Sequence, residues 1–263
     1  MKSIFCAAIL LFVWTPSVTA GDRVALIIGN SNYKSTARFS KAANDARAIA
    51  RKFKAIGFDY VALKLDATSA QMRMALDEFR SRAKQAAQAV VYFAGLGMQI
   101  DGENYLLPID AELRDAAFGD SKQAIELDAL HQAVGEAREL RLIILDACRD
   151  GPLAELPMVG LAVDNTINKK RRGVPCLAPI DAPNETIIVS ASKHGTVALD
   201  GDKPWSPFAR AILAHIATPG LDIGEIFDRV HTTVRFWTNQ RQQTVAYGDG
   251  KGWRAHIVPS RRH

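Results

Sequence analysis

Short apolar runs alternate along this chain with stretches whose apolar residues recur at helical spacing. The runs cover residues 23–29, 60–65, 89–93, 141–145 and 186–191. Their lengths suit strands, and several are apolar without interruption, as in strands buried on both faces. Because strand and helix alternation builds a parallel sheet covered by crossover helices, we predict an α/β fold with a mostly parallel sheet and helices on both faces.

Capping residues mark where the intervening helices begin. We expect Asn44 to cap the first helix, which Gly57 ends. Thr68 and Gln71 have the spacing of a capping box. Ser206 followed by proline is typical of a helix start. Three more elements are expected: a hairpin turning at residues 101–102, a helix at about 128–139 and a helix around 223–234.

The beginning of the chain has the pattern of a secretory leader. Lys2 precedes the apolar residues 4–14, and Val18, Thr19 and Ala20 then form a small-residue cleavage site. A membrane anchor is the alternative, but the apolar run is shorter than the roughly 20 residues that a span needs. We therefore predict a signal peptide at 1–20, a periplasmic or secreted product and a single domain at 21–263, with no membrane association after cleavage.

Composition removes several other classes. The chain has 263 residues, 48% hydrophobic and 23% charged, which suits a globular core. Its net charge of +5 is spread out, with one basic run at 169–172, so nucleic acid is not a predicted partner. Two cysteines, Cys148 and Cys176, remain after the leader, too few for a disulfide framework, and whether they pair is open.

A nucleotide site is the first candidate on a parallel sheet, but its glycine patterns are missing. The turn after the first strand lacks G-x-G-x-x-G. Gly95 and Gly97 begin such a pattern, and Ile100 takes the place of its third glycine. No P-loop pattern occurs. We predict no cofactor and no metal.

Chemistry on such a sheet gathers where the strands end. We call this edge the rim, and it draws on four segments, 30–33, 95–97, 146–149 and 190–195. Cys148 comes directly after a buried strand, between Asp146 and Asp150. That position suits a nucleophile, because a nearby base or positive charge raises the thiolate fraction. A small, half-buried residue at a strand end is the alternative interpretation.

Five segments together resemble the caspase and metacaspase superfamily, particularly its bacterial, orthocaspase-type members. They read RVALIIGNSNY, AANDA, VVYFAGLGMQIDGENYLLPID, LIILDACRD and IIVSASKHG. The resemblance implies a doubly wound, six-stranded sheet. It also implies a p20-like part at about 21–150, a flexible loop at about 151–185 and a p10-like part at about 186–263. Cys148 lies in the expected D-A-C context and would be the nucleophile of a cysteine endopeptidase.

The sequence departs from this family at Leu96. The family's loop ordinarily reads G-H-G, and here Gly95 and Gly97 flank a leucine. Leucine cannot accept the thiol proton or protonate a leaving amine. The flanking glycines indicate that the shape of the loop persists without its base.

Other residues take roles from the resemblance. His194 follows the fifth strand and could reach the rim as a substitute base, although an exposed loop histidine is the plainer interpretation. Asp45 and Asp146 match positions that bind substrate arginine or lysine, since paired carboxylates recognise guanidinium groups. Their structural alternatives are a first-turn residue of a helix and a strand-end cap.

Three hypotheses follow. The leading one is an exported caspase-like homologue, inactive or severely impaired, that still binds peptides or proteins with basic residues. The second is an active Arg- or Lys-specific endopeptidase with a substitute base. The third is a non-catalytic interaction module. The oligomeric state and any dependence on calcium are left open by the sequence.

Overall fold

The computed structural model describes residues 22–34, 41–100, 102–114, 117–118, 123–147, 173–175, 177–183, 185–193, 196 and 198–260. Its main sheet has six strands in the order β12-β11-β9-β3-β1-β2. Five of them are mutually parallel, and β12 is antiparallel at one edge. The strands are β1 (Arg23–Gly29), β2 (Tyr60–Leu65), β3 (Gln88–Ala94), β9 (Leu140–Asp146), β11 (Thr186–Ser190) and β12 (Val245–Tyr247). The predicted mostly parallel six-stranded sheet is confirmed.

Side chains alternate along the central strands between two separate cores. On β9, Ile143 and Leu145 pack into one core, and Leu142 and Ile144 pack into the other. All four are fully buried. Uninterrupted apolar runs are therefore required here, because both faces of these strands are covered.

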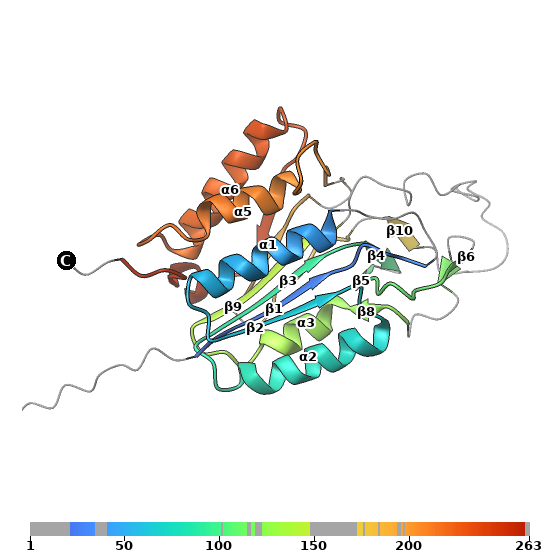
Figure 1. Ribbon diagram of the computed structural model, residues 1–263, viewed down its shortest axis with the longest axis horizontal. Coiled ribbons are helices and arrows are strands. Elements are labelled where there is room, and N and C mark those ends of the chain that lie inside the picture. Colours follow the sequence, from blue (N-terminus) through green and yellow to red (C-terminus); the bar gives the residue numbers. More distant parts are fainter. Residues whose placement is uncertain are drawn as a thin grey trace, which may run out of the picture.

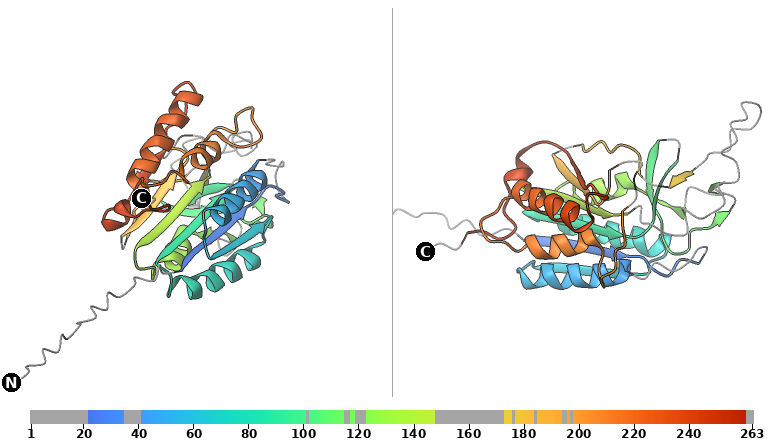
Figure 2. Two further views of the ribbon diagram at one scale, coloured as in Figure 1. Left: turned by 60° about the vertical axis from the view of Figure 1, so that its left-hand side comes forward. Right: turned by 90° about the horizontal axis from the view of Figure 1, so that it is seen from above.

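Helices cover both faces, as predicted (Figure 1). One face carries α1 (Ala42–Ala55), α5 (Pro207–His215) and α6 (Ile223–Trp237), which lie side by side when seen from above (Figure 2). The other face carries α2 (Ser69–Ala83) and α3 (Leu127–Val134). None of the described helices is long and apolar enough to cross a membrane.

Helix starts agree only partly with the sequence pattern. The capping box of Thr68 and Gln71 and the cap at Ser206 are present. The prediction for Asn44 is wrong, since α1 already begins at Ala42 and Lys41 supplies no side-chain cap. Instead, the backbone N–H of Ala43 donates to Ser31 Oγ from the loop after β1, at 2.9 Å. A contact across the fold thus replaces the local cap.

The α3 helix is shorter than predicted. It ends at Val134 with Gly135 as its C-cap, whereas the sequence pattern extended to residue 139. Ala137 is buried beside this helix but no longer part of it.

A small antiparallel sheet lies near the carboxyl ends of the main strands (Figure 1). It contains β4 (Gly97–Ile100), β5 (Glu103–Leu106), β8 (Ile125–Glu126) and β10 (Gly173–Pro175). The β4–β5 hairpin confirms the predicted turn, where Gly102 has a φ of 90°. β10 falls inside the predicted loop, so part of that loop is a strand. The remaining elements are β6 (Leu113–Arg114), β7 (Ala117–Phe118) and the 3-10 helix η2 (Lys251–Arg254).

Candidate functional site

The described parts of the rim segments lie at one edge of the main sheet. Gly29 is the register partner of Ala94, and Ala94 is the partner of Asp146. On the far side of β9, Leu145 is the partner of Ser190. Four strands therefore end level with one another, and the loops that follow them start side by side.

Residues 95–97 run close against the end of β9. The backbone N–H of Gly95 donates to the carbonyl of Asp146 at 3.2 Å. A Cβ atom on Gly97 would lie 3.2 Å from the Cβ of Ala147. The segment that contains Leu96 thus packs against the residue that directly precedes Cys148.

Tyr33 closes this loop from the other side. Its hydroxyl accepts the Leu96 backbone N–H at 2.8 Å and donates to the carbonyl of Leu107 at 3.3 Å. A Cβ on Gly95 would lie only 2.5 Å from that hydroxyl, so glycine is needed for the close approach. The backbone path of the loop is therefore fixed by groups other than the residue at position 96.

The Leu96 side chain is buried, with 1% of its surface exposed. It belongs to a small apolar cluster formed by Tyr33, Met98, Tyr105, Leu107, Ala111 and Ala124. No group at this position can transfer a proton. Leu96 acts here as a packing residue.

Three residues that the sequence analysis singled out, Cys148, Cys176 and His194, lie outside the described residues. What was predicted for them therefore stays a prediction. The register still relates two of the candidate positions along the chain. Leu96 comes two residues after Ala94, and Cys148 comes two residues after its partner Asp146.

Asp45 and Asp146 are brought together by one serine. Ser206 donates its backbone N–H to Asp45 Oδ1 at 3.1 Å and its hydroxyl to Asp146 Oδ2 at 2.7 Å. The Tyr92 hydroxyl donates to the same Asp146 oxygen at 3.2 Å. Both carboxylates are fully buried. The two predicted binding residues thus share one network on the α1 and α5 face of the sheet.

Ser206 and Tyr92 were not among the predicted site residues. Ser206 was recognised from its Ser-Pro pattern only as a helix cap, and it does accept the Ala209 backbone N–H at 3.0 Å. Its second role depends on residues 60 and 161 positions away in the chain. Tyr92 lies inside an apolar run, where its hydroxyl gave no separate signal.

Asp66 holds the first rim loop. Its Oδ1 accepts the backbone N–H groups of Ser31 at 2.8 Å and Asn32 at 2.9 Å. Burial raises the pKa of Asp66, but the hydrogen bonds from Ser31 and Asn32 lower it by more. The net pKa of Asp66 therefore lies below its ordinary value. Asp66 was not predicted as part of the site.

With the fold and the described part of the rim established, we compared the sequence with known protein families. The caspase domain family matches residues 22–249 of the chain. The chain belongs to the caspase domain family. This supports assignment to a family of cysteine-type peptidases, while activity itself depends on the site residues.

Two curated proteins are similar to part of this caspase-family chain. Mucosa-associated lymphoid tissue lymphoma translocation protein 1 of Homo sapiens is 33% identical over 97 residues, which is 37% of this chain and 12% of that protein. Its homolog in Mus musculus is 32% identical over 92 residues, or 35% of this chain and 11% of the mouse protein. The chain thus matches about a tenth of the length of either relative.

Proposed function

We propose that this protein is an exported member of the caspase domain family whose endopeptidase activity is absent or severely impaired. The observation that carries the proposal is Leu96, which is 1% exposed within an apolar cluster. The superfamily resemblance puts the general base at this position. Without a base, a thiol at Cys148 lacks the partner that would activate it and protonate the leaving amine.

Retained binding of basic peptides is the second part of the proposal. Asp45 and Asp146 share hydrogen bonds from Ser206, which orients the two carboxylates beside the end of β9. A guanidinium group can bridge two such carboxylates. Both carboxylates are fully buried, so binding of a side chain to them requires the packing around Ser206 to move.

Peptidase assays on residues 21–263 test the catalytic part. The wild-type chain and its Cys148→Ala variant are compared on peptides with Arg, Lys or a neutral residue before the scissile bond. The proposal expects equal background rates for both. Turnover after Arg or Lys that Cys148→Ala abolishes would instead support an active endopeptidase with a substitute base.

Binding is measured separately with uncleavable peptide ligands on the Cys148→Ala chain. We expect arginyl and lysyl peptides to bind, and their neutral counterparts to bind much more weakly. Absence of binding by all of them would contradict this part and favour an interaction module that uses another surface.

Alkylation of Cys148 tests His194 as a substitute base. If His194 forms an ion pair with the thiolate, the thiol reacts well below its reference pKa of about 8.5, and His194→Ala loses that acid limb. Superimposable pH profiles would remove His194 from the proposed site.

Export is tested by the intact mass of the protein recovered outside the cytoplasm. The leader pattern predicts that the chain starts at Gly21. A mass that still includes residues 1–20 would contradict cleavage.

A further inference from the structure

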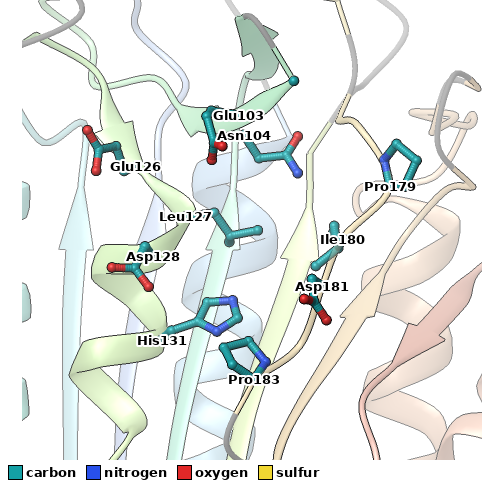
Figure 3. A pocket seen from close by; sticks show the side chains of 11 residues that line it. Glu103, Asn104, Glu126, Leu127, Asp128, His131, Pro179, Ile180, Asp181 and Pro183 are labelled. Atoms are coloured by element: carbon teal, nitrogen blue, oxygen red, sulfur yellow. The ribbon is translucent and has the colours of Figure 1, made fainter.

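A pocket lies on the face of the sheet opposite to Asp45 and Asp146. It has a volume of about 340 Å³ and is bounded by β5, the β8–α3 segment and residues 179–183 (Figure 3). The carboxylates of Asp128 and Asp181 stand on two sides of it, with the ring of His131 between them (Figure 3). We call this the acidic pocket.

The acidic pocket has an unusual charge for this protein. Four carboxylates line it, those of Glu103, Glu126, Asp128 and Asp181, and no lysine or arginine does. The chain as a whole carries a net charge of +5. Within the described residues, none of these four carboxylates forms a salt bridge with a basic side chain. Asp128 Oδ2 does accept a hydrogen bond from the Gln132 side-chain amide at 2.6 Å, but that amide is neutral and leaves the negative charge of the pocket uncompensated.

His131 supplies an independent observation that points to a ligand. The residue is 8% exposed and lines the pocket, and its Nδ1 atom is buried without a hydrogen-bond partner. Burial lowers its pKa, against the opposing charges of Asp128 and Asp181. The neutral ring therefore adds no positive charge to the pocket. A buried polar atom without a partner is unfavourable, and a ligand N–H group would satisfy it.

The walls between these polar groups are apolar and fixed. Leu127 and Ile180 line the pocket with two prolines, Pro179 and Pro183. The Asn104 amide holds the wall in place, since its Oδ1 accepts the Ala178 N–H at 2.7 Å and its Nδ2 donates to the Ala178 carbonyl at 3.4 Å. The pocket therefore combines apolar walls with several separated acceptors.

The spacing of the acceptors in the acidic pocket favours a guanidinium group over a metal ion. Among the described residues, no three His, Cys, Asp or Glu side chains stand close enough together to hold a metal ion. The acceptors are spread around the cavity instead. A guanidinium group fits this distribution, because it carries five N–H donors in a plane and its aliphatic stem can pack on apolar walls.

We propose that the acidic pocket binds the side chain of an arginine in a partner polypeptide. Its guanidinium would donate to Asp128, Asp181 and His131, with the stem against Leu127 and Ile180. This site is separate from the Asp45 and Asp146 pair and does not depend on the proposed loss of peptidase activity.

Titration of N-acetyl-arginine methylamide into the full chain carrying Cys148→Ala tests the proposal. Calorimetry gives the affinity, and ¹⁵N spectra of the histidine side chains identify the site. We expect the His131 ring signals to shift on binding, with His131→Gln assigning them. N-acetyl-citrulline methylamide, which has the same shape without the charge, should bind at least about tenfold more weakly.

The double variant Asp128→Asn with Asp181→Asn should weaken arginine binding at this site at least about tenfold. Both residues are exposed at the surface, so the fold should be retained. Asp77→Asn, at an exposed carboxylate on α2, is the matched control and should leave binding unchanged.

Four results would overturn the proposal. One is binding that leaves the His131 ring signals unchanged, because the ligand then lies outside the acidic pocket. The second is binding that is equal for citrulline and arginine. The third is a pocket that takes up calcium and not the arginine probe. Tighter binding of free arginine than of the blocked probe would point to an amino acid and contradict a polypeptide ligand.

Discussion

The hydroxyl of Ser206 donates a 2.7 Å hydrogen bond to Asp146, and the same oxygen accepts the Ala209 backbone N–H at the start of α5. One side chain thus caps a helix and holds a carboxylate at the end of β9. The start of α5 is thereby linked directly to Asp146 of the proposed binding pair.

Ser206→Ala should lower the free energy of unfolding by about 2 kcal/mol, since it removes a helix cap and a hydrogen bond to a carboxylate. Urea denaturation measures this. Ser81→Ala on α2 is the matched control, because Ser81 is exposed and its hydroxyl donates to the Asp77 carbonyl of its own helix. We expect a change below about 0.5 kcal/mol. Equal effects of the two substitutions would contradict the double role of Ser206.

Gly95→Ala should destabilise the protein by about 1–3 kcal/mol, because its methyl group would approach the Tyr33 hydroxyl to 2.5 Å. Tyr33→Phe removes that hydroxyl and also its bond to the Leu96 N–H. In the double variant, part of the clash is relieved. Its loss of stability should therefore be smaller than the sum of the two single losses by more than about 0.5 kcal/mol. Additive effects would show that Phe93, which a Cβ on Gly95 would also meet, dominates the clash.

Leu96→His should raise cleavage after Arg or Lys at least about a hundredfold, the lower range for a positioned acid-base group. It should also cost about 1–3 kcal/mol of stability, because it places an imidazole in the apolar cluster around Leu96. Assays therefore belong well below the unfolding temperature of the variant. Leu96→Met keeps an apolar side chain and serves as the inactive control. A folded Leu96→His chain without gain would mean that other parts of the site are lost as well.

Asp66 should give the protein an acid-sensitive component of stability. Its folded pKa lies below its ordinary value, so the unfolded state binds the proton more readily. The contribution is fully present above the ordinary aspartate pKa of about 4 and is lost as pH falls through the lower folded value. Asp66→Asn should remove this dependence and lower stability at neutral pH by about 1 kcal/mol, reduced by partial exposure. Unfolding midpoints measured between acid and neutral pH check both effects, and an unchanged acid slope would contradict them.

The sequence pattern was sufficient for the layers of the fold because these depend on periodicity. Buried strands such as β3 and β9 have continuous apolar centres, residues 89–94 and 142–145, and α2 places Met72 and Phe79 on one buried face. The edge strand β12 was not located, since its three residues include an exposed alanine and no fully buried side chain. An edge strand that is only partly buried leaves a weak hydrophobic pattern in the sequence.

The site was less predictable because its contacts connect distant parts of the chain. Ser206 bonds both Asp45 and Asp146, but the sequence around Ser206 indicates only a helix N-cap. Asn44 was wrongly expected as a cap because Ser31 takes that role from the loop after β1. The acidic pocket also depends on tertiary structure, since Asp128 and Asp181 belong to separate segments.

The alternation of side chains along β9 also keeps the two faces of the sheet chemically separate. Ile144 and Asp146 point towards α1 and α5, whereas Ile143 and Leu145 point towards the layer that contains α3 and His131. Residues that are neighbours in sequence therefore serve different cores. One face can be redesigned, or can change its ligand, while the packing that shapes the other is left intact.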